Sequence, residues 1–392
     1  MTSRGGVPWP SWRTWCAGAL ALALVACSSK STEPPAPSDG GGPPRMATPK
    51  GSWLDFPVEA EGPYNVGHRT VEITYTPPGG APPRTIPIEL WYPTLDTEGE
   101  TSTYGGLLKD ATSFEGASAA APLDGRAFPV HVYSHGSSGF AGTAWRTSRT
   151  FASHGWVVAA PNHVGNLLRD GTGKRPLAIS YLRSTDVSAT LDALEKLPSE
   201  DPLAGKLRTS RVLLSGHSFG AFTALASVGV TFDAKVLEAR CASGEFSVPC
   251  KPEEIAVFTK GLGDPRVAAA VPMAGTPSDS VSDYGAAKAP VMLMSGTLDV
   301  SSGPIFERAN GVDVTWLELT GGCHEVFALG GCKELDETRG YRIVATYLLA
   351  FGRRLVLGDA SENTQSIVTG QKPVDAVVRY HHKGPTSPPG GP

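Results

Sequence analysis

Short runs of apolar residues alternate with stretches of helical character over most of this chain, and that alternation limits its possible folds more than any other feature. The runs are apolar at consecutive positions, so both faces of each strand would be buried. Strands of this kind are typical of parallel sheets that helices cover on both sides. The runs lie at residues 128–133, 156–160, 211–214, 267–271, 290–294 and 314–319. We expect helices at residues 142–154, 181–197, 219–229 and 337–352.

The chain is therefore expected to be an α/β protein with a mostly parallel, doubly wound sheet. Residues 70–75 and 85–92 alternate with period two around a Pro-Pro-Gly-Gly turn, which predicts an N-terminal antiparallel hairpin. Residues 230–265 form an insertion that is either a small cap over the site or a surface excursion. We expect the folded domain to span residues 53–356 and residues 357–392 to form a poorly ordered C-terminal tail.

The first 26 residues have the pattern of a signal peptide. Two arginines precede an uncharged apolar run at residues 17–26, which is too short to span a bilayer. Residues 24–27, Leu-Val-Ala-Cys, resemble a bacterial lipobox, so we expect Cys27 to be lipidated and to anchor an exported lipoprotein at the outer membrane or cell surface. Ordinary secretion is the alternative. Residues 27–52 are rich in Pro, Ser and Gly and indicate a flexible tether.

The net charge and the cysteines indicate which binding partners, disulfides and metal sites to expect. The formal net charge is −4, with no basic excess, so we expect no nucleic-acid partner, and we expect a monomer. Beyond Cys27 four cysteines remain, and in an oxidising compartment we expect them to form two local disulfides. A zinc site is the alternative, but no Cys-x-x-Cys pair is present, so we expect no metal. The expected disulfides are Cys241–Cys250 and Cys323–Cys332.

The sequence Gly216-His217-Ser218-Phe219-Gly220 is the sharpest pointer to chemistry. A serine hydroxyl becomes a nucleophile when a base can reach it and the backbone holds it clear of the surface. A tight strand-to-helix turn achieves this, and glycine two residues on either side removes Cβ atoms that would clash. The pattern alone is weak in a chain with 46 glycines, and a merely structural turn is the alternative. Its position between a buried strand and a helical stretch favours a nucleophilic Ser218.

The partners of such a serine should follow in the order acid, then histidine, each after a later strand. Asp299 follows the run at 290–294, and His324 follows the run at 314–319. His324 would take the proton of Ser218, while Asp299 would orient the imidazole ring. Asp264 and Asp283 are rival acids, but neither follows a strand so directly. A Cys323–Cys332 bond would limit the movement of the loop that carries the base.

A tetrahedral intermediate also needs N–H donors for its oxyanion. We expect these donors to be the backbone N–H groups of Phe219, directly after the nucleophile, and Ser137, in the loop after residues 128–133. His135 could act as a second base but is expected to brace this loop. Three further histidines are interpreted as structural or surface residues: His154, His163 and His217. Three aromatic residues near these loops are expected either to line the acyl pocket or to be plain core: Phe140, Trp145 and Phe327.

Several stretches together resemble the platelet-activating-factor acetylhydrolase and dienelactone-hydrolase-like branch of the α/β-hydrolases. They lie, in order, at residues 90–94, 133–136, 152–161, 183–186 and 216–220, and the resemblance runs from about residue 64 to 353. Residues 295–299 and 321–324 are also similar to cutinase-like polyester hydrolases. Two departures matter: dienelactone hydrolases have a cysteine where this chain has Ser218, and the acetylhydrolases place their acid one strand earlier, where residues 271–275 lack a carboxylate.

The resemblance implies an α/β-hydrolase fold and a serine carboxylic ester hydrolase that acts on short or truncated acyl esters without cofactor or metal. The expected partner is a small-molecule, lipid or polymer ester, together with the membrane that holds the Cys27 anchor. Alternatives on the same scaffold are a polyester or cutin-type hydrolase, a peptidase and an acyltransferase, because a fold does not fix its substrate. A surface lipoprotein without enzymatic activity is a further alternative.

Overall fold

A computed structural model describes residues 44–385 of the 392-residue chain. The predicted signal peptide at residues 1–26, the predicted lipidation of Cys27 and most of the predicted tether lie outside the described residues. Between residues 44 and 385, no helix has the length and apolar character needed to cross a membrane.

The centre of the fold is a sheet whose six central strands run parallel to one another. These strands are β5 (Phe128–Ser134), β6 (Val157–Pro161), β7 (Leu207–His217), β9 (Val267–Met273), β11 (Val291–Gly296) and β12 (Val314–Leu319). Most of their residues are buried, including all those of β5, β6 and β11. Burial on both faces explains why the strands are apolar at consecutive positions. All six runs that predicted buried strands are confirmed.

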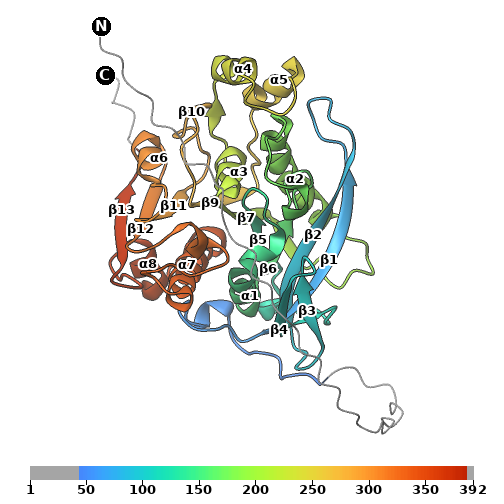
Figure 1. Cartoon of the computed structure of the whole chain (residues 1–392). Coiled ribbons are helices and arrows are strands. Elements are labelled where there is room, and N and C mark those ends of the chain that lie inside the picture. Colours follow the sequence, from blue (N-terminus) through green and yellow to red (C-terminus); the bar gives the residue numbers. More distant parts are fainter. Residues whose placement is uncertain (1–43, 386–392) are drawn as a thin grey trace, which may run out of the picture. The chain divides into compact units, whose positions relative to one another are not determined.

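Antiparallel strands extend this sheet at both edges. β1 (Asn65–Tyr75) and β2 (Arg84–Thr94) form the predicted hairpin, and β2 pairs with β6. Three strands of this sheet were not predicted: β3 (Glu100–Tyr104), β4 (Leu108–Glu115) and β13 (Val378–Lys383). The described part of the chain thus holds an eleven-stranded sheet in the order β13-β12-β11-β9-β7-β5-β6-β2-β1-β4-β3 (Figure 1).

Helices pack on both faces of the sheet, as the doubly wound prediction requires (Figure 1). One face carries α2 (Ala178–Glu195), α3 (Phe219–Ser227) and α6 (Gly303–Arg308). The other face carries α1 (Trp145–Ser153), α7 (Glu337–Gly352) and α8 (Glu362–Val368). The neighbouring residues Leu213 and Leu214 of β7 enter different core clusters, because successive side chains of a strand point to opposite faces.

The order of the strands creates a switch point beside β5. From β5 the chain passes through α1 to β6 on one side of β5, and then through α2 to β7 on its other side. The loops that leave the carboxyl ends of β5 and β7 therefore diverge, and in open α/β sheets ligands bind in the crevice that this divergence opens. The sequence motif around Ser218 lies at this point.

The insertion at residues 230–265 stands beyond α3 (Figure 1). It contains β8 (Thr231–Phe232), α4 (Ala234–Ala242) and α5 (Pro252–Lys260), and β8 pairs with β10 (Val281–Asp283). The predicted disulfide Cys241–Cys250 is present and ties α4 to the segment just before α5. Residues of the insertion line a cavity of about 1020 Å³, which supports the cap interpretation over a surface excursion.

Both predicted domain boundaries need correction. Arg45 forms an ion pair with Asp96 at 2.9 Å, so the chain joins the domain before residue 53. The predicted tail at residues 357–392 is wrong for residues 357–385, because α8 packs in the core and β13 pairs with β12. The tail prediction failed because β13, Val-Arg-Tyr-His-His-Lys, is an edge strand with one half-covered face, so it lacks an apolar run.

Replacing Ile367 by alanine tests this correction. Ile367 in α8 is 0% exposed and packs in the cluster beneath α7. Removing buried methyl groups costs their transfer free energy and leaves a cavity, so Ile367→Ala should lower the free energy of unfolding by roughly 2–5 kcal/mol in urea denaturation. The exposed Glu362→Gln, in the same helix, is the control. An unfolding midpoint equal to that of the parent protein would show that this segment is not packed.

Candidate active site

Ser218 occupies a strained turn between β7 and α3. Its φ of 55° and ψ of −116° lie in a region that side-chain-bearing residues rarely adopt. The crowding around the turn explains both glycines of the motif: a Cβ on Gly216 would lie 2.0 Å from the carbonyl oxygen of Gly220, and a Cβ on Gly220 would lie 1.9 Å from the carbonyl oxygen of Ser134. The strand-turn-helix setting expected for this motif is therefore present.

The acid and the histidine expected from the sequence are joined by a hydrogen bond. Asp299 lies in the loop after β11 and His324 in the loop after β12, and Nδ1 of His324 is 2.9 Å from Oδ2 of Asp299. The carboxylate can only accept, so Nδ1 carries the proton and Nε2 is left as the basic nitrogen. The hydrogen bond that His324 donates to Asp299 raises the pKa of His324 above its ordinary value. The His324 side chain is 37% exposed, so a small molecule can reach it.

All three side chains line one cavity of about 1020 Å³. A hydrogen bond joins the Ser218 turn to the loop that carries His324: Nε2 of His217 donates to the carbonyl oxygen of His324 at 2.9 Å. The centres of the two imidazole rings lie 4.6 Å apart. Within residues 44–385 the hydroxyl of Ser218 has no hydrogen-bond partner, His324 included. Hydrogen bonds of this kind are often long in the unliganded protein and shorten only when substrate is bound.

The loop after β5 lies directly against Ser218. A Cβ on Gly136 would be 3.2 Å from the Cβ of Ser218, so Ser137, the residue after Gly136, follows directly on a position that lies against the nucleophile. The backbone N–H groups of Ser137 and Phe219 have no acceptor among the described residues, as oxyanion donors require. Ser137 is not among the residues that line the cavity, so its role stays a prediction.

His135 braces this loop, as predicted. The ring is fully buried, and burial lowers its pKa far below the ordinary value, so it is neutral. Its Nδ1–H donates to the carbonyl oxygen of Gly136 at 2.7 Å, and its Nε2 accepts from the backbone N–H of His163 at 3.0 Å. The other three histidines are also buried and hydrogen-bonded, which confirms their structural interpretation: His154, His163 and His217.

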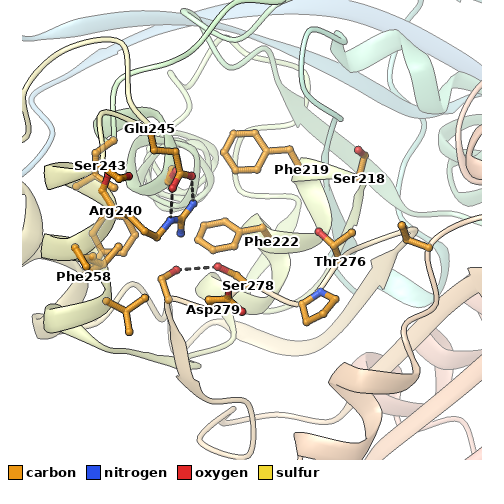
Figure 2. A pocket seen from close by; sticks show the side chains of 18 of the residues that line it. Ser218, Phe219, Phe222, Arg240, Ser243, Glu245, Phe258, Thr276, Ser278 and Asp279 are labelled. Carbon is orange, nitrogen blue, oxygen red and sulfur yellow. Dashed lines mark hydrogen bonds and ion pairs between the residues drawn. The ribbon is translucent and has the colours of Figure 1, made fainter. Parts of the chain in front are cut away.

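Aromatic and polar side chains face each other across the cavity (Figure 2). Phe219 and Phe222 project from α3 with ring centres 5.8 Å apart, and Phe258 comes from α5 of the insertion. The polar side includes the hydroxyl groups of Thr276, Ser278 and Ser280. In Figure 2 the two α3 phenylalanines lie between Ser218 and an ion pair of the insertion, Arg240–Glu245.

The aromatic residues predicted for the acyl pocket lie elsewhere. Phe140 lines a separate cavity of about 290 Å³, Trp145 packs beside Tyr104 with ring centres 6.3 Å apart, and Phe327 is a core residue, 3% exposed. That prediction is corrected: none of the three lines the cavity of Ser218 in the described structure. The residues missed are Phe222, whose position four residues after Ser218 on a helix was a usable signal, and Phe258, which had no local signal.

The rival acids are engaged in other contacts. Asp264 pairs with Arg266 at 2.7 Å, and Asp283 accepts from the backbone N–H of Gly285 at 2.7 Å. The predicted Cys323–Cys332 disulfide is present immediately before the base. Among residues 44–385, no group of three or more His, Cys, Asp or Glu side chains is arranged to hold a metal ion.

The contact between His324 and Asp299 makes a prediction about titration. In Asp299→Asn the ring loses its carboxylate partner, so the pKa of His324 should fall below that of the parent protein. The His324 ring protons, followed by NMR as pH is varied, report this directly. Asp283→Asn, a rival acid outside the contact, should leave the titration of His324 unchanged. Equal His324 titrations in the parent and Asp299→Asn proteins would contradict the pairing.

Comparison with models of protein families found no match for this chain, and comparison with curated proteins found none either. The site brings together a serine on a strained turn and a hydrogen-bonded histidine and aspartate, all at the carboxyl edge of a parallel sheet.

Proposed function

We propose that this chain is a serine carboxylic ester hydrolase with an α/β-hydrolase fold, as the sequence resemblance implies. The single observation that carries the proposal is that the strained Ser218 turn opens into the same cavity as the hydrogen-bonded His324–Asp299 pair. The acid follows β11, which is the position that the sequence indicated. Ser218, Asp299 and His324 supply the nucleophile, the orienting acid and the general base of a triad.

The proposed reaction passes through an acyl-enzyme. Oγ of Ser218 attacks the ester carbonyl carbon while Nε2 of His324 takes the hydroxyl proton, and the oxyanion accepts hydrogen bonds from the N–H groups of Phe219 and Ser137. The C–O bond to the alcohol breaks as His324 returns the proton to the leaving oxygen. Water then attacks the acyl-enzyme with His324 as base, which releases the acid and restores Ser218. His324 is exposed to solvent, which favours water as the nucleophile that accepts the acyl group. The proposal is therefore hydrolysis and not transfer of the acyl group to another alcohol.

The cavity supports an ester with an apolar acyl group. Phe219 and Phe222 lie next to the nucleophile and can cover the acyl chain, while Thr276 and Ser278 face the more polar alcohol side. A volume of about 1020 Å³ accommodates the short or truncated acyl groups that the resemblance implies and leaves room for longer ones.

Export of the protein is part of the proposal. Both described disulfides form in oxidising compartments and are rare in the cytosol. They support export, and we propose that the exported protein is a lipoprotein anchored through Cys27 at the outer membrane or cell surface, with ordinary secretion as the alternative.

Replacing Ser218 by alanine tests the chemistry. The parent protein should react with a fluorophosphonate at one site, and Ser218→Ala should not react, because the phosphorus needs the serine oxygen. Ester turnover should fall roughly 10⁶-fold, as in other enzymes of this class. Ser199→Ala, which removes an exposed serine, is the control and should retain both properties. A folded parent protein that fails to react with the fluorophosphonate would contradict the proposal.

A substrate panel separates the alternatives. We would compare p-nitrophenyl esters from acetate to palmitate, a phospholipid, a polyester film and a p-nitroanilide amide. The proposal requires that an ester be cleaved faster than the matched amide, and preference for the amide would favour a peptidase.

The two disulfides form a matched pair for a further test, because each has a sequence separation of 9. The double variants Cys323→Ser/Cys332→Ser and Cys241→Ser/Cys250→Ser should each lose about 2–4 kcal/mol of stability. The first frees the loop that carries His324 and should lower kcat by about 10- to 100-fold. The second loosens the insertion that lines the cavity, so it should act mainly on KM. Thermal unfolding and ester turnover measure the two effects. A kcat equal to that of the parent protein in Cys323→Ser/Cys332→Ser would show that this bond does not position the base.

A further inference from the structure

A buried guanidinium without a carboxylate partner lies behind the Ser218 turn. Arg183, in α2, is 1% exposed. Within residues 44–385 no carboxylate oxygen lies within the 4.0 Å of an ion pair with it. Asp186, one turn further along α2, is paired with Arg84 at 3.0 Å and with His163 at 2.9 Å instead.

The acceptors of Arg183 come from three separate segments around the site. Nε donates to Oγ1 of Thr223 in α3 at 3.0 Å, and Nη1 donates to Oδ1 of Asn166, after β6, at 2.7 Å. Nη2 donates to Oγ of Ser134 at 3.1 Å and to the carbonyl oxygen of His135, both at the end of β5. A single side chain thus joins the loops on the two sides of the switch point.

Through Asn166, Arg183 is connected to the loop that carries Ser137, one of the two predicted oxyanion donors. Nδ2 of Asn166 donates to Oγ of Ser137 at 3.1 Å, and the backbone N–H of Ser138 donates to the carbonyl oxygen of Asn166 at 3.1 Å. Ser138 has a φ of 55°, so this loop adopts a strained conformation that its surroundings must maintain.

Arg183 also contacts the segment that carries Phe219, the other predicted oxyanion donor. Its guanidinium carbon lies 4.8 Å from the ring centre of Phe219, and Thr223, which accepts from Nε, donates to the carbonyl oxygen of Phe219 at 3.2 Å. The start of α3 and the loop after β5 are therefore held by the same planar group.

A cation at this depth is costly without a direct ion-pair partner, and Asp186 attracts Arg183 only from beyond ion-pair distance. An apolar side chain would fill the space at lower cost. Burial lowers the pKa of Arg183 to about 9, which still leaves it protonated at neutral pH. A fixed positive charge behind the donors would favour the negative charge that develops on the oxyanion. The hydrogen bonds of Arg183 and its positive charge would therefore both stabilise the transition state in which the oxyanion forms.

We propose that Arg183 is a positioning residue of the oxyanion hole, which fixes the backbone donors of Ser137 and Phe219 and adds positive charge behind them. This inference rests on the proposed ester hydrolysis. Arg183 does not touch the substrate, so its effect should appear in the rate of the chemical step and in the binding of tetrahedral adducts, while substrate binding stays largely unchanged.

The test compares Arg183→Gln and Arg183→Lys with the parent protein. Losing one oxyanion donor costs about 10²- to 10³-fold in kcat, so Arg183→Gln should lower kcat by about that factor with KM within about threefold. Arg183→Lys keeps the positive charge but lacks the planar guanidinium group and its several N–H donors. Its kcat should therefore lie between those of the parent protein and Arg183→Gln. Affinity for phenylboronic acid, which forms a tetrahedral adduct with the serine, should fall by the same factor as kcat/KM.

Arg353→Gln is the matched control. Arg353 is 3% exposed and paired with Asp359 at 2.9 Å, and it packs away from the site beside α8. This variant should lose stability in thermal unfolding while its kcat stays within about threefold of the parent value. If Arg183→Gln does not fold, Thr223→Val and Asn166→Ala decide the matter, because each removes one acceptor of Arg183 and should lower kcat more than it changes KM.

The outcomes separate this inference from the proposed function. A parent protein that hydrolyses esters, together with a folded Arg183→Gln whose kcat is unchanged or whose loss lies entirely in KM, would overturn the inference alone. If Arg183→Gln fails to fold, unchanged kcat in both acceptor variants would overturn it equally. A parent protein that neither hydrolyses esters nor reacts with a fluorophosphonate would instead overturn the proposed function.

Discussion

The site depends on one close approach of backbone to backbone. The turn after β7 presses against itself and against the end of β5, where a Cβ on Gly216 or Gly220 would lie about 2 Å from a carbonyl oxygen. This approach holds Ser218 at a φ of 55°, a conformation that costs of order 1–3 kcal/mol and persists only where the surroundings enforce it. The hydroxyl therefore projects from the head of the sheet, where loops of several strands meet.

The remaining parts of the site follow from the parallel order of the strands. Because β5, β7, β11 and β12 all end at one edge, their loops deliver the Ser134–Gly139 segment, Ser218, Asp299 and His324 to neighbouring positions. The insertion adds the outer wall of the cavity. Arg183 then connects these segments below the site, because its hydrogen bonds reach the loops after β5 and β6 and the start of α3.

The sequence predicted those features that depend on local constraints. Strands buried on both faces must be apolar at consecutive positions, so all six parallel strands could be recognised, and the crowding of the Ser218 turn is visible in its two glycines. Positions after strands were sufficient to predict the Asp299–His324 contact. The pocket walls were not predictable in this way: Phe140, Trp145 and Phe327 are near site residues in sequence, but they do not line the cavity of Ser218. The wall that contains Phe258 depends on how the insertion packs. Edge strands such as β13 escaped notice because they lack an apolar run.

The most direct test of the account is a crystal structure of the protein after reaction with a fluorophosphonate. The account predicts phosphorus bonded to Oγ of Ser218, Nε2 of His324 within hydrogen-bond distance of that oxygen, and one phosphoryl oxygen accepting from the N–H groups of Phe219 and Ser137. A structure with His324 several ångströms from the modified serine, or with the adduct on another residue, would contradict it.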